Sequence, residues 1–160
     1  MTTLEKALKS KENIYSSMVE TIASRLYDVR KEGIKDILSG FQNTTHRLEE
    51  VTNVRGISFI NDSKATNVNA TWFALESMHR PVIWIAGGQD MGNDYESLKD
   101  LVDKKVKALI CLGNDNGNIM DFFRDKVGLI METTDMKEAV HAAYAIGQPG
   151  DVVLLSPACP

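Results

Sequence analysis

The densest group of polar side chains in the sequence lies at residues 61–67, Asn-Asp-Ser-Lys-Ala-Thr-Asn. It follows a short β-rich run at residues 56–60 and precedes a helical pattern at residues 68–78. A loop between a strand and a helix N-terminus gathers N–H groups and partial positive charge, which favours phosphate or carboxylate. Asn67 is placed to cap the helix. The plainer interpretation is a polar turn with one cap, but six polar residues in seven, with Lys64 among them, favour anion binding.

Three further segments could contribute to the same site, because each directly follows an apolar run. They are Gly87-Gly88-Gln89-Asp90, Gly113-Asn114-Asp115 and Ser156-Pro157. In parallel sheets, ligands bind at the carboxyl ends of the strands. Paired glycines permit a ligand to approach the backbone closely, although a tight turn also explains them. His46-Arg47 precedes the first predicted strand, and the Arg47 guanidinium offers a two-pronged donor for phosphate.

The elements that must position these residues alternate between strand and helix patterns. We expect strands at residues 48–54, 57–60, 81–86, 106–112, 127–131 and 152–155, and helices at 68–78, 95–102, 118–123 and 136–146. The first two strands should form a hairpin that turns at residues 53–56. Continuously apolar strands that alternate with helices predict an α/β fold, a doubly wound, mostly parallel sheet covered on both faces.

Residues 1–44 differ in pattern from the rest of the chain. They carry two amphipathic helical patterns and no strand pattern, with apolar residues at Ile14, Met18, Ile22 and Leu26, and then at Ile34, Ile37, Leu38 and Phe41. Two such helices cannot bury their apolar faces alone. We therefore expect residues 1–44 to form a helical segment separate from an α/β domain at residues 45–160.

Composition excludes several classes of protein. The 160 residues carry a net charge of −4, which argues against nucleic-acid binding. No apolar run is long enough to span a bilayer and no signal peptide is visible, so we expect a cytoplasmic location. Cys111 lies in an apolar run and should be a buried thiol. No metal site is predicted from the residue pattern.

Four motifs, in this order, resemble those of the Mur ligases. They are His46-Arg47-Leu48-Glu49, Asn61 to Asn67, Gly87-Gly88 and Ser156-Pro157-Ala158-Cys159, and the resemblance extends from about residue 8 to residue 160. It implies a Rossmann-like C-terminal ligase domain at residues 45–160, truncated at its C-terminus. Residues 1–44 would be the last helices of the central ATP-binding domain. The N-terminal domain and the rest of the central domain, with the phosphate loop and the metal site, would lie outside this chain.

The resemblance also implies a reaction. It is strongest to the Mur ligases of peptidoglycan synthesis that add D-glutamate to UDP-N-acetylmuramoyl-L-alanine, using ATP and Mg²⁺ through an acyl phosphate. Lys64 would be catalytic, because its ammonium would neutralise charge near the transferred phosphoryl group. The nucleotide would be bound by Arg47, Asp62 and Asn13. D-glutamate would be bound by Thr66, Ser63, Gly87 and Gly88. The chain alone would be inactive.

Three positions depart from the pattern of the family. Glu12 and Ser16 replace a His and an Asn of a helix near the adenine, and Met91 stands where D-glutamate ligases usually carry a Lys for the side-chain carboxylate. A thioether cannot pair with a carboxylate. Two alternatives stay open: a freestanding doubly wound module that binds a small anion at residues 62–67, and a related amide ligase such as a folate polyglutamylating enzyme. A phosphate loop upstream and a further Ser downstream would favour the D-glutamate ligase.

Overall fold

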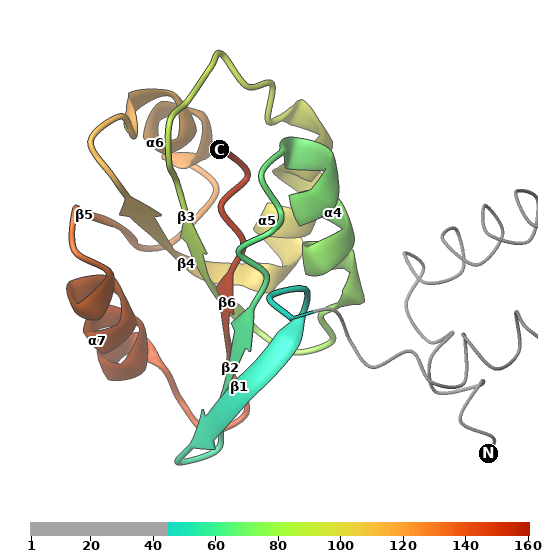
Figure 1. Ribbon diagram of the computed structural model, residues 1–160, viewed down its shortest axis with the longest axis vertical. Helices are drawn as coiled ribbons and strands as arrows, with labels where there is room; N and C mark the ends of the chain where they lie inside the picture. The colour runs from blue at the N-terminus through green and yellow to red at the C-terminus, as the bar shows by residue number, and fades with distance from the viewer. Residues whose placement is uncertain (1–44) are drawn as a thin grey trace, which may run out of the picture. The chain divides into compact units, whose positions relative to one another are not determined.

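The computed structural model describes residues 45–160, which form a sheet of six strands in the order β1-β2-β6-β3-β4-β5 (Figure 1). In this part of the chain, β1 (Glu49–Val54) is antiparallel to β2 (Ile57–Asn61), and every other neighbouring pair is parallel. The remaining strands are β3 (Val82–Ala86), β4 (Val106–Leu112), β5 (Ile130–Thr133) and β6 (Val152–Leu155). The predicted α/β class is confirmed. The helices predicted in residues 1–44 lie outside the described residues.

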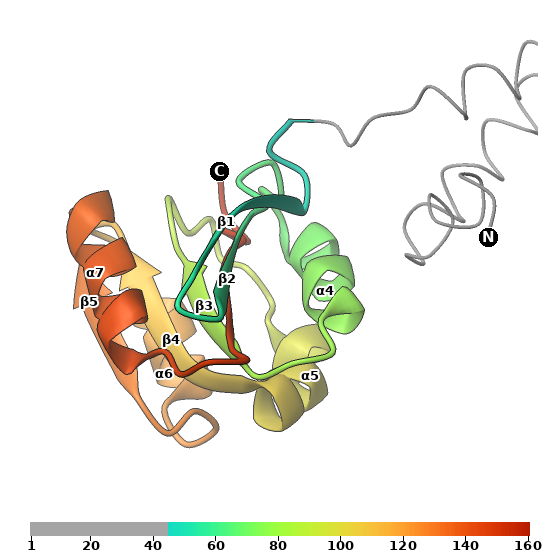
Figure 2. The same ribbon diagram turned by 90° about the horizontal axis from the view of Figure 1, so that it is seen from below.

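Helices cover both faces of the sheet, as the doubly wound prediction requires (Figure 2). One face is covered by α4 (Val68–Ser77), the short 3₁₀ helix η1 (Glu96–Leu98), α5 (Lys99–Lys105) and α6 (Gly117–Phe123). The other is covered by α7 (Met136–Ile146). Successive strand residues point to opposite faces, so Trp84 packs under the first group of helices while Ile83 and Ile85 pack under α7.

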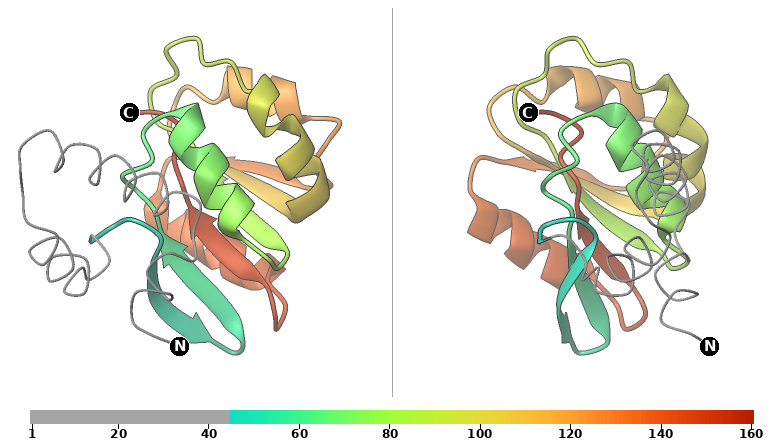
Figure 3. Two further views of the ribbon diagram at one scale, coloured as in Figure 1. Left: turned by 90° about the vertical axis from the view of Figure 1, so that its right-hand side faces the viewer. Right: turned by 45° about the vertical axis from the view of Figure 1, so that its right-hand side comes forward.

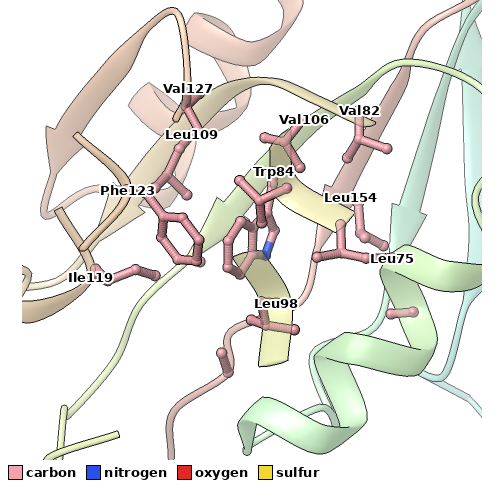
Figure 4. Packing of buried hydrophobic residues seen from close by; sticks show 14 of the residues in the cluster. Leu75, Val82, Trp84, Leu98, Val106, Leu109, Ile119, Phe123, Val127 and Leu154 are labelled. Carbon is pink, nitrogen blue, oxygen red and sulfur yellow. The ribbon is translucent and has the colours of Figure 1, made fainter. Parts of the chain in front are cut away.

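Trp84 is the centre of the larger core cluster (Figure 4). Its indole is fully buried and meets the Phe123 ring edge-on, with ring centroids 5.6 Å apart. Burying a Trp removes ~150–250 Å² from water, worth about 4–6 kcal/mol. The indole N–H donates to the carbonyl oxygen of Ser156 at 2.8 Å, so the polar end of the ring is satisfied. This bond connects the core directly to the segment that follows β6.

The β1–β2 hairpin turns at Arg55 and Gly56, inside the predicted range (Figure 3). Both residues have positive φ, 54° and 82°, as a two-residue turn of this hand requires. Arg55 is an unusual residue for that conformation. Asn53 holds the turn by accepting a hydrogen bond from the Gly56 N–H at 3.1 Å, and the Arg55 guanidinium lies 5.9 Å from the centre of the Tyr144 ring.

Two predicted elements have clearly different bounds in the structure, and the other predicted strands and helices agree to within one residue at each end. β5 begins at Ile130 and not at residue 127, because the Val127 N–H bonds back to the Phe123 carbonyl in the turn that ends α6. Val127 is buried as a core residue instead of pairing with β4. The helix predicted at residues 95–102 begins as 3₁₀ and continues to Lys105. Its last turn is polar, so no apolar periodicity marks it.

Candidate functional site

The candidate site is the carboxyl edge, where the loops after β2, β6, β3 and β4 lie together at the top of Figure 1. Three segments there are central: the Lys64 loop (residues 62–67), the glycine loop (residues 87–93) and the C-terminal segment (residues 156–160). The Asp62 N–H donates to the carbonyl oxygen of Leu155 at 2.8 Å, and the Gly87 N–H donates to that of Pro157 at 2.9 Å. A Cβ on Gly113 would lie 3.4 Å from the Gly88 carbonyl oxygen, so the four predicted strand-end segments do gather at one edge.

Asp62 holds this edge together from within the protein. It is only 5% exposed. One carboxylate oxygen accepts the Leu48 N–H at 3.2 Å, and the other accepts the Ser156 hydroxyl at 3.1 Å. The Ser156 hydroxyl also lies 3.0 Å from the Thr71 hydroxyl of α4. A buried carboxylate is stable only when donors such as these surround it. These contacts give Asp62 a structural role, and direct nucleotide binding by Asp62 stays a prediction.

Arg47 lies on a strained segment beside the Lys64 loop. Its neighbours His46 and Leu48 have left-handed backbones, with φ of 66° and 43°. Such conformations cost about 1–3 kcal/mol each and persist where the surroundings enforce them. Here the Lys64 N–H donates to the His46 carbonyl at 3.3 Å, and the Asn61 amide lies 2.9 Å from the His46 ring. The exposed Arg47 is therefore carried at a fixed place next to the exposed Lys64.

The Lys64 loop exposes some residues and anchors others. Ala65 is buried, and its carbonyl accepts the Ala158 N–H at 3.0 Å, while Lys64 and Thr66 on either side are exposed. The half-buried Ser63 donates its N–H to the Asn61 side chain at 3.0 Å. The predicted cap is confirmed, since Asn67 accepts the Ala70 N–H at 2.9 Å. The loop thus presents an ammonium and a hydroxyl from a fixed backbone.

The two glycines are explained by contacts within the described chain. A Cβ on Gly87 would lie 2.3 Å from the Leu112 carbonyl oxygen, and a Cβ on Gly88 would lie 2.5 Å from that of Pro160. Both residues also have positive φ, 122° and 153°. Glycine is needed here so that the glycine loop can pack against β4 and the C-terminal segment. Contact of either glycine with a ligand stays a prediction.

Sequence reasoning missed a polar cluster on the glycine loop. Asp90, Asn93 and Tyr95 form hydrogen bonds with one another and with Asn118 of α6. Burial tends to raise the pKa of Asp90, but hydrogen bonds from Asn93, Asn118, Tyr95 and Gly92 outweigh it and lower this pKa overall. The same loop carries Met91, whose side chain is 76% exposed. An Asp two residues before a Gly was the available signal of a side-chain-stabilised turn.

The two cysteines are buried free thiols, as predicted for Cys111. Burial raises the pKa of Cys111 to about 12, with smaller contributions from Glu132 and Cys159. Burial also raises the pKa of Cys159, whose sulfur lies 3.3 Å from the Asn93 amide and 3.5 Å from the Tyr95 hydroxyl. High thiol pKa values indicate structural residues rather than nucleophiles.

An open cavity of about 760 Å³ lies at the opposite edge of the sheet, around the first residues of β3 and β4. It is lined by several cations, two of which, Lys105 and Lys107, are engaged by the fold. Lys105 donates to the carbonyls of Leu75, Glu76 and Met78 at 2.8–3.0 Å, at the end of α4. Lys107 pairs with Asp151. Basic residues at helix ends offset the helix dipole, so this cavity is not our candidate site.

Among residues 45–160, no group of three or more His, Cys, Asp or Glu is placed to hold a metal ion. None of the helices described in that range is long and apolar enough to cross a membrane. Asn13, Glu12 and Ser16 lie outside the described residues. The roles assigned to Lys64, Arg47 and Thr66 stay predictions, although the structure brings the three residues to one edge.

Curated relatives match nearly the whole chain. The chain is 50% identical over 159 residues to a UDP-N-acetylmuramoylalanine–D-glutamate ligase of Christiangramia forsetii, covering 99% of this chain and 36% of that protein. It is 48% identical over 153 residues to the same-named ligase of Porphyromonas gingivalis, covering 96% of this chain and 34% of that protein. The chain therefore spans about a third of the length of these relatives.

Solved structures share the fold at low sequence identity. A UDP-N-acetylmuramate–alanine ligase of Thermotoga maritima superposes with a TM-score of 0.64 at 12% identity, over 93% of this chain and 35% of that chain. A bifunctional folylpolyglutamate synthase/dihydrofolate synthase of Yersinia pestis gives 0.58 at 16% identity, over 80% and 32%. The family described as Mur ligase, glutamate ligase domain, matches residues 46–159. The motifs, the sheet topology and this match agree, and the chain belongs to that Mur ligase family.

Proposed function

We propose that this chain is part of an ATP-dependent amide ligase that adds D-glutamate to UDP-N-acetylmuramoyl-L-alanine in peptidoglycan synthesis. The named D-glutamate ligases that are 48–50% identical over almost all of the chain support this proposal. Because the chain spans about a third of their length, we propose that the substrate-binding and phosphate-loop domains belong to the remainder of the protein. Residues 1–44 would then end the central ATP-binding domain. The proposal places the enzyme in the cytoplasm, where ATP is available.

The observation that carries the proposal is the pair of cations at the carboxyl edge. The backbone bond from Lys64 to His46 places the Arg47 segment beside the Lys64 loop, and both cations are exposed. In the proposed reaction, the terminal phosphoryl group of ATP passes to a substrate carboxylate and forms an acyl phosphate and ADP. The amine of D-glutamate then attacks the carbonyl carbon, phosphate leaves, and the nitrogen loses a proton. Lys64 would stabilise the charge on the phosphoryl oxygens, while Arg47 would hold phosphate with two donors.

Asp62 would act on nucleotide binding through Arg47. Its carboxylate accepts the Leu48 N–H and so holds the segment that carries Arg47. A buried carboxylate with partners in the protein suits this task better than direct contact with a ribose. Asn13 would contribute near the adenine, as the family pattern implies.

D-glutamate would be bound between the Lys64 loop and the glycine loop. Thr66 and Ser63 offer hydroxyl and N–H donors for a carboxylate, and Gly87 and Gly88 shape the facing backbone. Met91 supplies no charge there, so the side-chain carboxylate of D-glutamate would take its hydrogen bonds from other donors. A folate polyglutamylating enzyme is the second candidate, supported by the likeness of fold alone.

The described residues fit phosphate and carboxylate groups but not a metal ion. The exposed cations suit anions, whereas residues 45–160 hold no cluster of metal ligands. Mg²⁺ would therefore be bound by another part of the protein, and none of the residue roles proposed above depends on it.

The test is turnover by the full-length protein that contains this chain. Purified enzyme should release ADP and phosphate only when ATP, UDP-N-acetylmuramoyl-L-alanine and D-glutamate are all present. L-glutamate with a folate acceptor tests the second candidate. The 160-residue chain alone should give no release above background, since we propose that the phosphate loop lies elsewhere. Turnover by this chain alone, or D-glutamate-independent release by the full-length protein, would contradict the proposal.

A further inference from the structure

Asp90 accepts hydrogen bonds from four donors, and its two oxygens divide them. Oδ1 accepts the N–H groups of Gly92 and Asn93, at 2.8 and 2.9 Å. Oδ2 accepts the Tyr95 hydroxyl at 3.1 Å and the Asn118 amide at 2.9 Å. Oδ1 therefore closes the turn of the glycine loop, while Oδ2 ties that turn to residues outside it.

The partners of Asp90 lead to two other parts of the carboxyl edge. Asn118 belongs to α6, and its amide also donates to the Asn93 carbonyl at 3.0 Å. Asn93 in turn donates to the Ala158 carbonyl at 3.3 Å. Tyr95 is 1% exposed and cannot follow a moving loop. The glycine loop is thus fixed to α6 and to the C-terminal segment, although Met91 at its tip points largely into solvent.

We propose that Asp90 is a positioning residue that fixes the glycine loop through Oδ2 and so sets where residue 91 meets the amino-acid substrate. The proposal rests on the function proposed above, because that function brings D-glutamate to this loop. It adds a residue whose contribution is indirect, since Asp90 holds the loop without contacting the substrate.

A carboxylate is the group that these four donors require. An ionised Asp only accepts hydrogen bonds, and two oxygens can satisfy four donors. Asn at this position could still accept the two backbone N–H groups with its Oδ1. Its NH₂ group would face the Tyr95 hydroxyl and the Asn118 NH₂, so the latter contact would become donor against donor. Asp90→Asn therefore breaks the tie to Asn118 and preserves the turn, while the Tyr95 hydroxyl can still accept a hydrogen bond from the new NH₂ group.

The decisive measurement is steady-state kinetics of the full-length ligase with Asp90→Asn. Loss of the tie to Asn118 should raise KM for D-glutamate about tenfold, because the loop must be ordered again on binding, while kcat changes less than threefold. Asp94→Asn is the matched control, since Asp94 is exposed and only caps the Glu96 N–H, which Asn can also cap. It should behave as the unmodified enzyme does.

A double variant tests whether Oδ2 acts through α6. Asn118→Ala should also raise KM for D-glutamate, and Asp90→Asn with Asn118→Ala should be no worse than the more damaging single change. Fully additive effects would overturn the proposal, as would an unchanged KM in Asp90→Asn or an equal rise in Asp94→Asn.

Hydrogen exchange of the 160-residue chain separates failure of this inference from failure of the proposed function. Asp90→Asn should speed exchange at residues 87–93 at least tenfold and leave the strands unchanged. Unchanged exchange there refutes the positioning role whatever the enzyme does. A full-length protein with no D-glutamate-dependent turnover, together with faster exchange in the variant, refutes the function and with it the substrate part of the inference.

Discussion

Asp62→Ala, which removes the carboxylate, should lower the free energy of unfolding far more than Asp62→Asn, which removes only its charge. Asp62→Ala leaves the Leu48 N–H without this acceptor and opens a void beside Ser156. Hydrogen bonds to a charged group are worth about 1.5–3 kcal/mol each, or roughly 3–6 kcal/mol for two. The Ser156 hydroxyl can turn toward Thr71, 3.0 Å away, and recover part of this. We expect a net loss of about 3–4 kcal/mol.

Asp62→Asn should cost much less, about 1 kcal/mol. The Asn Oδ1 can keep the Leu48 N–H, and its NH₂ can donate to Ser156 once that hydroxyl donates to Thr71. For a domain of this size, 1 kcal/mol corresponds to roughly 3–6 °C in Tm. The expected fall in Tm is therefore about 10–20 °C for Ala and about 3–6 °C for Asn.

Thermal and urea denaturation of the 160-residue chain measure both variants. The control is Asp121→Ala, because the Asp121 side chain is 72% exposed and pairs only with the equally exposed Arg124, an interaction worth about 0–1 kcal/mol. An Asp62→Ala variant no less stable than Asp121→Ala would refute the structural role of Asp62. If Asp62→Asn is folded, the ATP affinity of this variant in the full-length enzyme can be measured without a contribution from unfolding.

Four further outcomes are expected. Lys64→Ala in the full-length enzyme should lower kcat about a hundredfold, as for loss of a preorganised charge, and a change in KM alone would contradict the catalytic role. Met91→Lys should lower KM for D-glutamate several-fold with little change in kcat, since a partly exposed ion pair is worth about 1 kcal/mol, and an unchanged KM would show that another residue holds that carboxylate. Gly87→Ala should destabilise the chain by at least about 2 kcal/mol in urea titration because its Cβ would lie 2.3 Å from a backbone oxygen, whereas Gly117→Ala, with no atom within 4 Å, should be close to neutral. Cys111 should resist thiol reagents at pH 8 unless the chain unfolds. Burial raises the pKa of Cys111 from 9.0 to about 12, so the stability that it contributes is complete below pH 9 and is lost as pH rises toward 12. Urea titrations across that range should show this pH-dependent loss of stability, and the loss should be absent in Cys111→Ala.

The elements that the sequence predicted well are those with uninterrupted apolar patterns. Residues 106–112 and 152–155 are strands at the predicted bounds because each is buried by helices on both faces. The start of β5 could not be read from the pattern, since a buried valine that packs beneath a turn looks the same as a strand valine. The last turn of α5 could not be predicted either, because Lys105 there is fixed by contacts with α4, which is distant in the sequence.

The location of the candidate site could be predicted from the sequence, but the roles of its individual residues could not. Strand ends and motifs located the Lys64 loop and the glycine loop at one edge. Sequence alone does not distinguish an exposed carboxylate that binds a ligand from a buried one that binds the protein, and Asp62 is the second kind. The Asp90 cluster depends on Asn118, which lies 28 residues further along the chain, and no local pattern links the two.

The C-terminal segment connects the Lys64 loop to the glycine loop, so the conformations of the two loops are coupled. Ala158 is bonded to both loops: its N–H donates to the Ala65 carbonyl of the Lys64 loop, and its carbonyl accepts the side-chain amide of Asn93 in the glycine loop. A ligand that shifts the Lys64 loop must therefore pull on the same residue that holds the glycine loop. Thermodynamic linkage then requires reciprocity. The factor by which a phosphate ligand changes the affinity for the amino acid equals the factor by which the amino acid changes the affinity for the phosphate ligand.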